Sequence, residues 1–184
     1  MTESRPADEG PTDKELIARW QAGDERAAAT LVARHAPALA RFAASAGAGA
    51  EVEELVQDTF VRAFASLDSF RGDSSLRTWL FTIERRLLLD RKRAARRRRP
   101  EIELQETDAV TAEDPLEQAV ATEAQVRLRR AVGRLTPTQR EVFVLRVAEG
   151  LSYKEIAEAL GTTEGAARVH YHNAMRAVKE FLDD

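Results

Sequence analysis

The sequence predicts an all-α protein with two small helical domains joined by an acidic linker, the second domain ending in a helix-turn-helix. Apolar residues recur at intervals of three and four along most of the 184 residues, which is typical of amphipathic helices. Convincing strand-like alternation of apolar and polar residues occurs nowhere in the sequence. Charge also divides the chain, because residues 76–99 hold ten basic and two acidic residues, whereas residues 100–123 hold eight acidic residues and no basic ones.

The composition argues against several classes of protein. With 43% apolar and 32% charged residues, the chain can form a packed core. The absence of cysteine excludes a disulfide-stapled scaffold, a thiol nucleophile and a metal site with cysteine ligands. We expect no metal or cofactor, because the three histidines are few and scattered: His35, His170 and His172. No apolar stretch is long enough to span a bilayer and no signal peptide is recognisable, so we expect a cytoplasmic protein without membrane insertion.

The N-terminal part of the chain begins with a tail and two helices. Residues 1–11 are polar and contain two prolines, which predicts a disordered tail. Thr12 and Glu15 have the spacing of a capping box, in which a hydroxyl and a carboxylate close the first turn of a helix. Asp24 is placed to cap the next helix. Pro37 lies inside that helix and predicts a kink, since proline removes one backbone donor.

Two further helices complete the first predicted domain. Apolar residues predict a helix over residues 52–67, and turn-forming residues predict a loop over residues 70–74. Ser74 or Ser75 is expected to cap a fourth helix, which ends in the arginine run at residues 96–99. The predicted organisation is a tail at residues 1–11, a first domain at 12–99, an acidic linker at 100–122 and a second domain at 123–184.

The second domain contains a helix-turn-helix pattern. Ser152 and Glu155 form a capping box, Gly161 permits the left-handed backbone of a tight turn, and Thr162 or Thr163 caps the second helix. The inward stripe of that helix is expected to be Ala167, Tyr171, Ala174 and Val178, and the opposite face carries Arg168, Val169, His172 and Arg176. A helix of this kind fits the major groove of DNA. The alternative is an ordinary helical hairpin.

Two other segments have strong charge patterns. The arginine-rich helix that follows Trp79 can track a phosphate backbone, although its basic end is also compatible with a solvated surface. Trp79 fits either a core position or an aromatic platform for unpaired bases. Residues 53–58 are acidic on one face of a helix, which is either plain solvated surface or a docking site for a basic protein.

These motifs together resemble bacterial sigma factors of the extracytoplasmic-function (ECF) class. The resemblance covers nearly the whole chain after the tail. It rests on ELVQDTFVRAF at residues 54–64, on FRGDSSLRTWL at 70–80, and on LTPTQREVF at 135–143 followed by GLSYKEIA at 150–157. In that family the three segments dock on polymerase, capture and melt the −10 promoter element, and read the −35 element, respectively.

The resemblance implies a sigma factor, not an enzyme, that directs core RNA polymerase to promoters and helps to open the −10 element. The implied partners are the β′ clamp helices and β flap of core polymerase, promoter DNA and an anti-sigma factor, and the linker would thread the polymerase near the RNA path. The implied polymerase-binding residues are Glu54, Gln57 and Asp58. The implied −10 residues are Arg71, Asp73, Ser74, Arg77, Trp79, Arg86, Arg91 and Arg93. The implied −35 residues are Thr163, Glu164, Arg168, His172 and Arg176.

The sequence departs from the family pattern in two places. Arg85 and Arg86 stand where the family commonly has an Arg-Asn pair. Residues 166–170 read Ala-Ala-Arg-Val-His where the family often has Thr-Val-Lys-Ser-Arg, and Asn173 replaces a basic residue. We therefore expect weaker phosphate contact at the −35 element and a pH-sensitive contact through His170 or His172.

Two rival functions remain at this stage. A helix-turn-helix regulator that does not join polymerase would leave the acidic face at residues 53–58 without a role. A metal-dependent nuclease would need a cluster of ligands, and no spacing brings the candidate carboxylates together on one helical turn with a histidine: Asp58, Asp68, Asp73 and Asp90.

Overall fold

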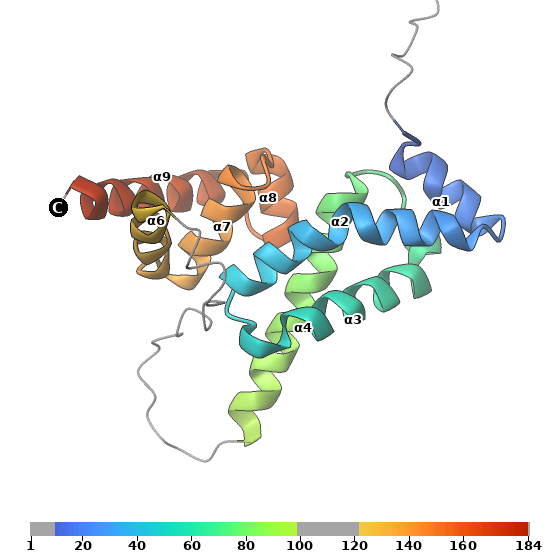
Figure 1. The fold of residues 1–184 in the computed structure, drawn as a ribbon, viewed down its shortest axis with the longest axis horizontal. Helices are drawn as coiled ribbons and strands as arrows, with labels where there is room; N and C mark the ends of the chain where they lie inside the picture. The colour runs from blue at the N-terminus through green and yellow to red at the C-terminus, as the bar shows by residue number, and fades with distance from the viewer. Residues whose placement is uncertain (1–9, 99–121, 184) are drawn as a thin grey trace, which may run out of the picture. The chain divides into compact units, whose positions relative to one another are not determined.

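The computed structural model describes residues 10–98 and 122–183, which contain eight α-helices, two short 3-10 helices and no strand (Figure 1). The predicted all-α class is therefore confirmed. The chain forms two compact units, residues 1–37 and residues 38–184. The predicted limit at residue 99, most of the tail and most of the linker lie outside the described residues. Residue 123, the predicted start of the second domain, is the first residue of a helix. The domain limits stay predictions.

The first unit contains helix α1 (Asp13–Gln21) and the first part of helix α2 (Glu25–Ser45). The Thr12–Glu15 capping box is present, with the Thr12 amide donating to Glu15 Oε2 at 2.6 Å. The carboxylate of Asp13 joins the two helices, because its Oδ2 lies 2.8 Å from His35 Nε2 and its Oδ1 accepts from Arg34 at 2.6 Å. His35 thus has a structural partner.

Helix α2 continues through Pro37 to Ser45. In the second unit, the 3-10 helix η1 (Gly49–Glu51) leads into α3 (Val52–Ala65), and η2 (Leu67–Ser69) follows it. Helix α3 ends two residues before the predicted limit, because the Ser66 amide donates back to the carbonyls of Arg62 and Ala63 and starts the 3-10 turn.

Helix α4 (Leu76–Arg98) packs along α3. Ser75, not Ser74, caps it, since Ser75 Oγ accepts the Thr78 amide at 3.1 Å. Phe81 of α4 meets Phe42 of α2 edge to face, with ring centroids 5.4 Å apart, and both side chains are fully buried.

Glu84 is an unexpected member of this core. The side chain is fully buried, and neither carboxylate oxygen has a hydrogen-bond partner. Burial alone raises the pKa of Glu84 to about 9, so the neutral acid is the form present at neutral pH. Sequence reasoning counted this residue only as one of two acids in a basic helix.

The remaining helices are α6 (Glu123–Gly133), α7 (Pro137–Val147), α8 (Tyr153–Leu160) and α9 (Glu164–Asp183). Helix α9 packs against the other three, and its small residues Ala167 and Ala174 are fully buried. Each of α6, α7 and α8 starts with a capping box, of which the sequence analysis identified only the one at Ser152.

The turn between α8 and α9 has the predicted chemistry. Gly161 adopts the left-handed conformation, with φ of +60°. The Thr163 hydroxyl accepts the Ala166 amide at 3.1 Å, so Thr163 is the cap of α9. At the start of α8, hydrogen bonds from the Ser152 amide and hydroxyl lower the pKa of Glu155.

Arg140 of α7 is buried against the end of α6. Its guanidinium donates to the carbonyls of Gly133 at 2.9 Å, Leu135 at 3.0 Å and Val132 at 3.3 Å. Gly133 is the last residue of α6, so its carbonyl is one that the end of a helix leaves without an intrahelical partner, whereas the Val132 carbonyl also accepts the Leu135 amide at 3.1 Å. Arg140 therefore fastens α7 to the turn that precedes it.

The described residues show neither a membrane-spanning helix nor a metal-binding cluster. None of these helices is both long enough and apolar enough to cross a membrane. Within residues 10–98 and 122–183, no three histidine, cysteine, aspartate or glutamate side chains are grouped so that they could hold a metal ion.

Candidate nucleic-acid and polymerase interfaces

Helix α4 presents one exposed line that combines an aromatic ring with cations. Trp79, Arg86 and Arg93 follow one another at intervals of seven residues, which is two helical turns, so they share a face. Arg86 and Arg93 are exposed. Trp79 is half-buried and rests against Phe70 of the preceding loop, with ring centroids 5.1 Å apart. Three of the predicted −10 residues are thus brought together.

The loop before α4 holds three more of the predicted −10 residues. Arg71 and Asp73 are exposed, and Ser74 is half-buried. Gly72 between them has φ of +75°, a conformation that side-chain-bearing residues rarely adopt. The contact of Phe70 with Trp79 anchors this loop beside the start of the aromatic and cationic line.

Arg77 lies on another side of α4 and is already paired. It donates to the Glu149 carbonyl at 2.9 Å and forms an ion pair with the Glu149 carboxylate. That carboxylate is fully buried and also accepts two hydrogen bonds from Arg41, at 2.8 and 3.1 Å. Arg77 therefore belongs to an internal ion cluster in this structure, which its position in the sequence did not predict.

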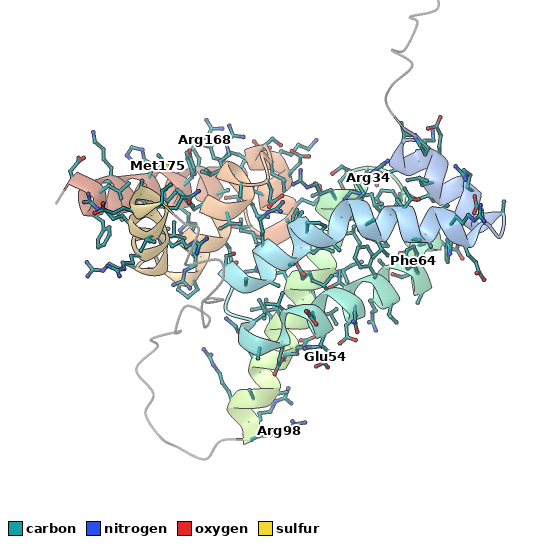
Figure 2. All side chains as sticks on the ribbon, in the orientation of Figure 1. Arg34, Glu54, Phe64, Arg98, Arg168 and Met175 are labelled. Carbon is teal, nitrogen blue, oxygen red and sulfur yellow. The ribbon has the colours of Figure 1, made fainter. Side chains whose placement is uncertain are left out.

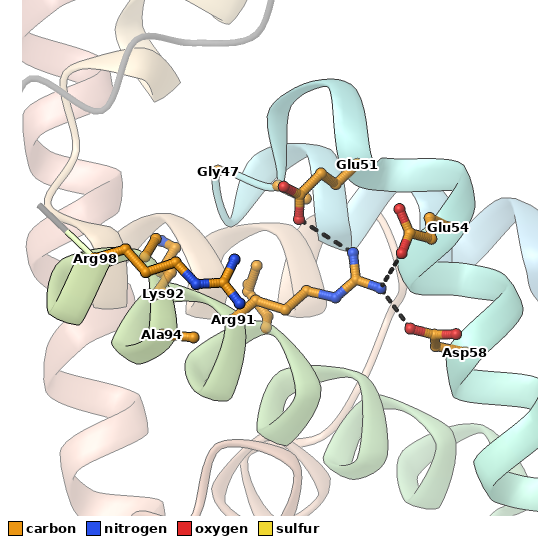
Figure 3. A pocket seen from close by; sticks show the side chains of 11 residues that line it. Gly47, Glu51, Glu54, Asp58, Arg91, Lys92, Ala94 and Arg98 are labelled. Carbon is orange, nitrogen blue, oxygen red and sulfur yellow. Dashed lines mark hydrogen bonds and ion pairs between the residues drawn. The ribbon is translucent and has the colours of Figure 1, made fainter.

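Arg91 is also engaged, on the side of α4 that faces α3. Its guanidinium forms ion pairs with Glu51 at 3.1 Å, with Glu54 at 3.3 Å and with Asp58 (Figure 3). Although partial burial opposes the charge, hydrogen bonds to Asp58 and Glu51 hold the pKa of Arg91 above its usual value. The network forms one wall of a pocket of about 560 Å³, to which α4 also contributes Lys92 and Arg98.

The three predicted polymerase-binding residues lie on one exposed face of α3. The side chains of Glu54 and Asp58 are 71% and 49% exposed, and Gln57 between them is exposed as well. Figure 2 shows Glu54 on the outer side of α3. Val61, one turn after Gln57, is 69% exposed and adds an apolar group to this face. The sequence analysis missed Val61, although its spacing from Gln57 placed it on the same side.

Helix α9 presents a cationic face to solvent. Arg168, His172 and Arg176 are all exposed, and Arg168 projects outward in Figure 2. The Arg168 guanidinium lies 5.0 Å from the centroid of the Tyr153 ring, which itself meets Tyr171 at 5.9 Å. Thr163 and Glu164, the other predicted −35 residues, are exposed at the start of the helix.

Comparison with known proteins matches both parts of the chain. Residues 31–98 match the family described as sigma-70 region 2, and residues 125–178 match sigma-70 region 4. The RNA polymerase sigma factor CnrH of Cupriavidus metallidurans is 34% identical over 180 residues, covering 93% of this chain and 94% of the relative. The ECF RNA polymerase sigma-E factor of Escherichia coli is 31% identical, covering 91% of this chain and 92% of the relative.

Solved structures agree with these matches. The sigma factor RpoE of Bartonella quintana, in complex with the anti-sigma factor NepR, has a TM-score of 0.70 and 30% identity over 84% of this chain and 95% of that one. CnrH in complex with the cytosolic domain of CnrY has a TM-score of 0.67 and 34% identity over 93% of this chain and 97% of that one.

The two matched regions decide between the functions that the sequence left open. A regulator that never joins polymerase would explain the helix-turn-helix but not a region 2 across residues 31–98. Both regions occur here in one chain, in the same order as in relatives that it covers almost from end to end. The chain is a member of the sigma-70 family, an ECF-class sigma factor that directs RNA polymerase to promoters.

Proposed function

We propose that this sigma factor, which belongs to a class of proteins that are not enzymes, recognises promoters with two separate helix faces. The exposed line of α4 binds the unpaired −10 strand, and the cationic face of α9 reads the −35 element. The observation that carries this proposal is the line of Trp79, Arg86 and Arg93. Both cations of this line lie at the surface, where Arg93 pairs, among the described residues, only with its exposed neighbour Asp90, at 3.2 Å. Arg77 and Arg91, in contrast, pair with carboxylates from other segments of the chain.

The −10 chemistry follows from the groups on this line. Arg86 and Arg93 neutralise phosphates, and the counterions that this releases favour binding. Trp79 and Phe70 offer ring surfaces on which unpaired bases stack. Flipping a base from the duplex costs a few kcal/mol. Stacking, together with contacts to Arg71, Asp73 and Ser74 of the adjacent loop, would offset that cost.

The −35 chemistry uses the start of α9. Backbone amides and the helix dipole at this end favour phosphate, and side chains of the first turns reach base edges in the major groove. The ring of Tyr153 restrains Arg168 by a cation–π contact, which reduces the side-chain freedom lost when it binds a base.

Protein partners follow from the family and from the acidic face of α3. We propose that Glu54, Gln57 and Asp58 dock on the β′ clamp helices of core polymerase, while the C-terminal helices contact the β flap. The Bartonella quintana relative was captured with an anti-sigma factor, and an anti-sigma factor is the proposed regulator of this chain too. The site of action is then the cytoplasm, where bacterial polymerase works.

The arginines of α4 offer a matched pair for testing the −10 proposal. Arg93 belongs to the exposed line, whereas Arg91, two residues earlier, lies about 200° around the helix and pairs with η1 and α3. We expect Arg93→Gln to weaken binding of fork-junction DNA and to lower its salt dependence by about 0.7 in log–log slope, the value for one single-strand phosphate. Arg91→Gln should leave that slope unchanged.

The measurement is the affinity of the complex with core polymerase for fork DNA from a promoter that the wild type transcribes, over a series of salt concentrations. Equal loss of slope in the two variants would contradict the division of α4 into a DNA side and an α3 side.

The docking proposal predicts a selective loss of polymerase binding. Gln57→Ala combined with Asp58→Arg should weaken binding to core polymerase at least tenfold, because a basic partner would meet a reversed charge. DNA binding by α9 should not change. Glu180→Arg, at an exposed position on α9, is the control for an equal change in charge. Unchanged affinity of the double variant for core polymerase would exclude this face of α3 as the docking site.

A further inference from the structure

Helix α9 carries an exposed apolar side chain in the middle of its cationic face. Val169 is 59% exposed. Gly165, Val169, His172 and Arg176 follow one another at steps of four, three and four, so they form one line along the helix. The side of α9 that lies opposite this line holds the buried residues Ala167, Ala174 and Val178. Val169 is thus on the outermost part of the helix, and no packing within the described residues explains an apolar group there.

Gly165, one turn before Val169, is equally unexplained by the fold. A Cβ atom added to it would meet only the Thr163 hydroxyl, at 4.0 Å, and its backbone does not require a glycine. Glycine weakens a helix relative to alanine. Glycine at this position therefore lowers the stability of α9. The missing side chain leaves space in which a partner can approach the surface of α9 beside Val169.

Charge and shape identify the partner. Arg168 lies beside this line, Arg176 belongs to it and Lys179 continues it, and these exposed cations favour a polyanion over an apolar protein surface. In the major groove of duplex DNA, base edges present hydrogen-bonding groups and one apolar group, the C5 methyl of thymine. A valine side chain cannot form a hydrogen bond, so a base pair that faces Val169 is favoured when it offers that methyl.

We propose that Val169 is a specificity-determining residue that reads the C5 methyl of a thymine in the −35 element, with Gly165 allowing the close approach. This inference rests on the proposed function of α9. It assigns to Val169 a selectivity that none of the charged residues on the same face supplies, because cations bind phosphates or guanine edges and leave a methyl group unread.

The test compares thymine with uracil, which differs only by that methyl. The full chain, bound to core polymerase of the same organism, is used to select −35 duplexes from a randomised pool. Each thymine of the selected site is then replaced singly by uracil. We expect one position at which the wild type loses about fourfold in affinity, the effect of removing one buried methyl group. Val169→Ser should show less than half of that effect, while Arg168→Gln should bind more weakly but keep it.

Gly165→Ala provides an independent check, because it should change thermal stability and DNA affinity in opposite directions. Alanine should raise the thermal stability of the chain and yet reduce affinity for the selected duplex, since the new methyl group occupies the space of approach. The inference is overturned if no thymine position responds to uracil, if Val169→Ser keeps the full response, or if Gly165→Ala binds as well as the wild type. Failure to enrich any sequence would instead contradict the −35 role of α9, and the inference with it.

Discussion

Replacing Glu84 by methionine is expected to stabilise the protein at neutral pH by several kcal/mol. The folded chain keeps Glu84 neutral, with a pKa of about 9, whereas an unfolded glutamate ionises above its ordinary value of 4.5. The penalty is absent below pH 4.5 and grows by about 1.4 kcal/mol per pH unit until the pH reaches the folded pKa. Between pH 5.5 and pH 7.5 this penalty therefore increases by about 3 kcal/mol. Methionine has a similar length and carries no polar oxygen to bury.

Urea unfolding at pH 5.5 and pH 7.5 measures this effect as a difference between variant and wild type, which cancels the other titrating groups. The Glu84→Met advantage should be larger at pH 7.5. Glu84→Gln separates the two causes, because it removes the titration and keeps an unpartnered polar group. Its free energy of unfolding relative to the wild type should rise with pH as much as that of Glu84→Met, but it should be lower than that of Glu84→Met at every pH. An advantage that does not grow with pH would show that Glu84 is ionised or hydrated in the folded chain.

Arg140→Met should have the largest destabilising effect among the arginine substitutions, about 2–4 kcal/mol, because the carbonyls of Gly133 and Leu135 lose the hydrogen bonds that Arg140 donates at a buried or part-buried site. Arg140 is 7% exposed, and its planar guanidinium donates hydrogen bonds to the carbonyls of Val132, Gly133 and Leu135. Arg140→Lys keeps the charge but lacks the fork, so it should recover little of the loss.

Hydrogen exchange over residues 122–183 reports the change where it occurs. Faster exchange in α6 and α7 of Arg140→Met is the expected result. Arg127→Met is the matched control, since Arg127 donates to a single carbonyl, that of Leu182, at an exposed site. Its exchange should stay close to that of the wild type. Equal exchange in Arg140→Met and the wild type would show that the carbonyls at the end of α6 find other partners.

Local features of this fold were predictable from the sequence. The capping boxes at Thr12 and Ser152 and the left-handed Gly161 involve residues close together in the chain, where identity and spacing determine the geometry. The same holds for the exposed line on α4, because helical periodicity alone places Trp79, Arg86 and Arg93 on one face. The sequence analysis made the capping and turn assignments, but it did not recognise the line on α4, because it left Trp79 between a core position and a base platform and grouped Arg86 and Arg93 with the other arginines.

Long-range pairing was not predictable in this way. Arg77 meets Glu149 across 72 residues, and Arg91 meets Asp58 across 33, so nothing in the local pattern distinguishes them from Arg93. Glu84 shows the same limit. Its charge predicts a surface position, yet it is buried on the same face of α4 as Leu80 and Leu88, one turn before and one turn after it. The −10 assignment therefore stays a prediction, and what the structure adds is which arginines of α4 have long-range partners.

The central claim is that this chain gives core polymerase a choice of promoter through two DNA-binding faces. The most direct measurement is in vitro transcription of fragmented genomic DNA from the same organism by core polymerase, with and without the purified chain, followed by mapping of the 5′ ends. The account predicts new start sites that share two short sequence elements upstream, and it predicts their loss when both Arg86 and Arg93 are replaced by glutamine. A pattern of 5′ ends identical to that of core polymerase alone would contradict it.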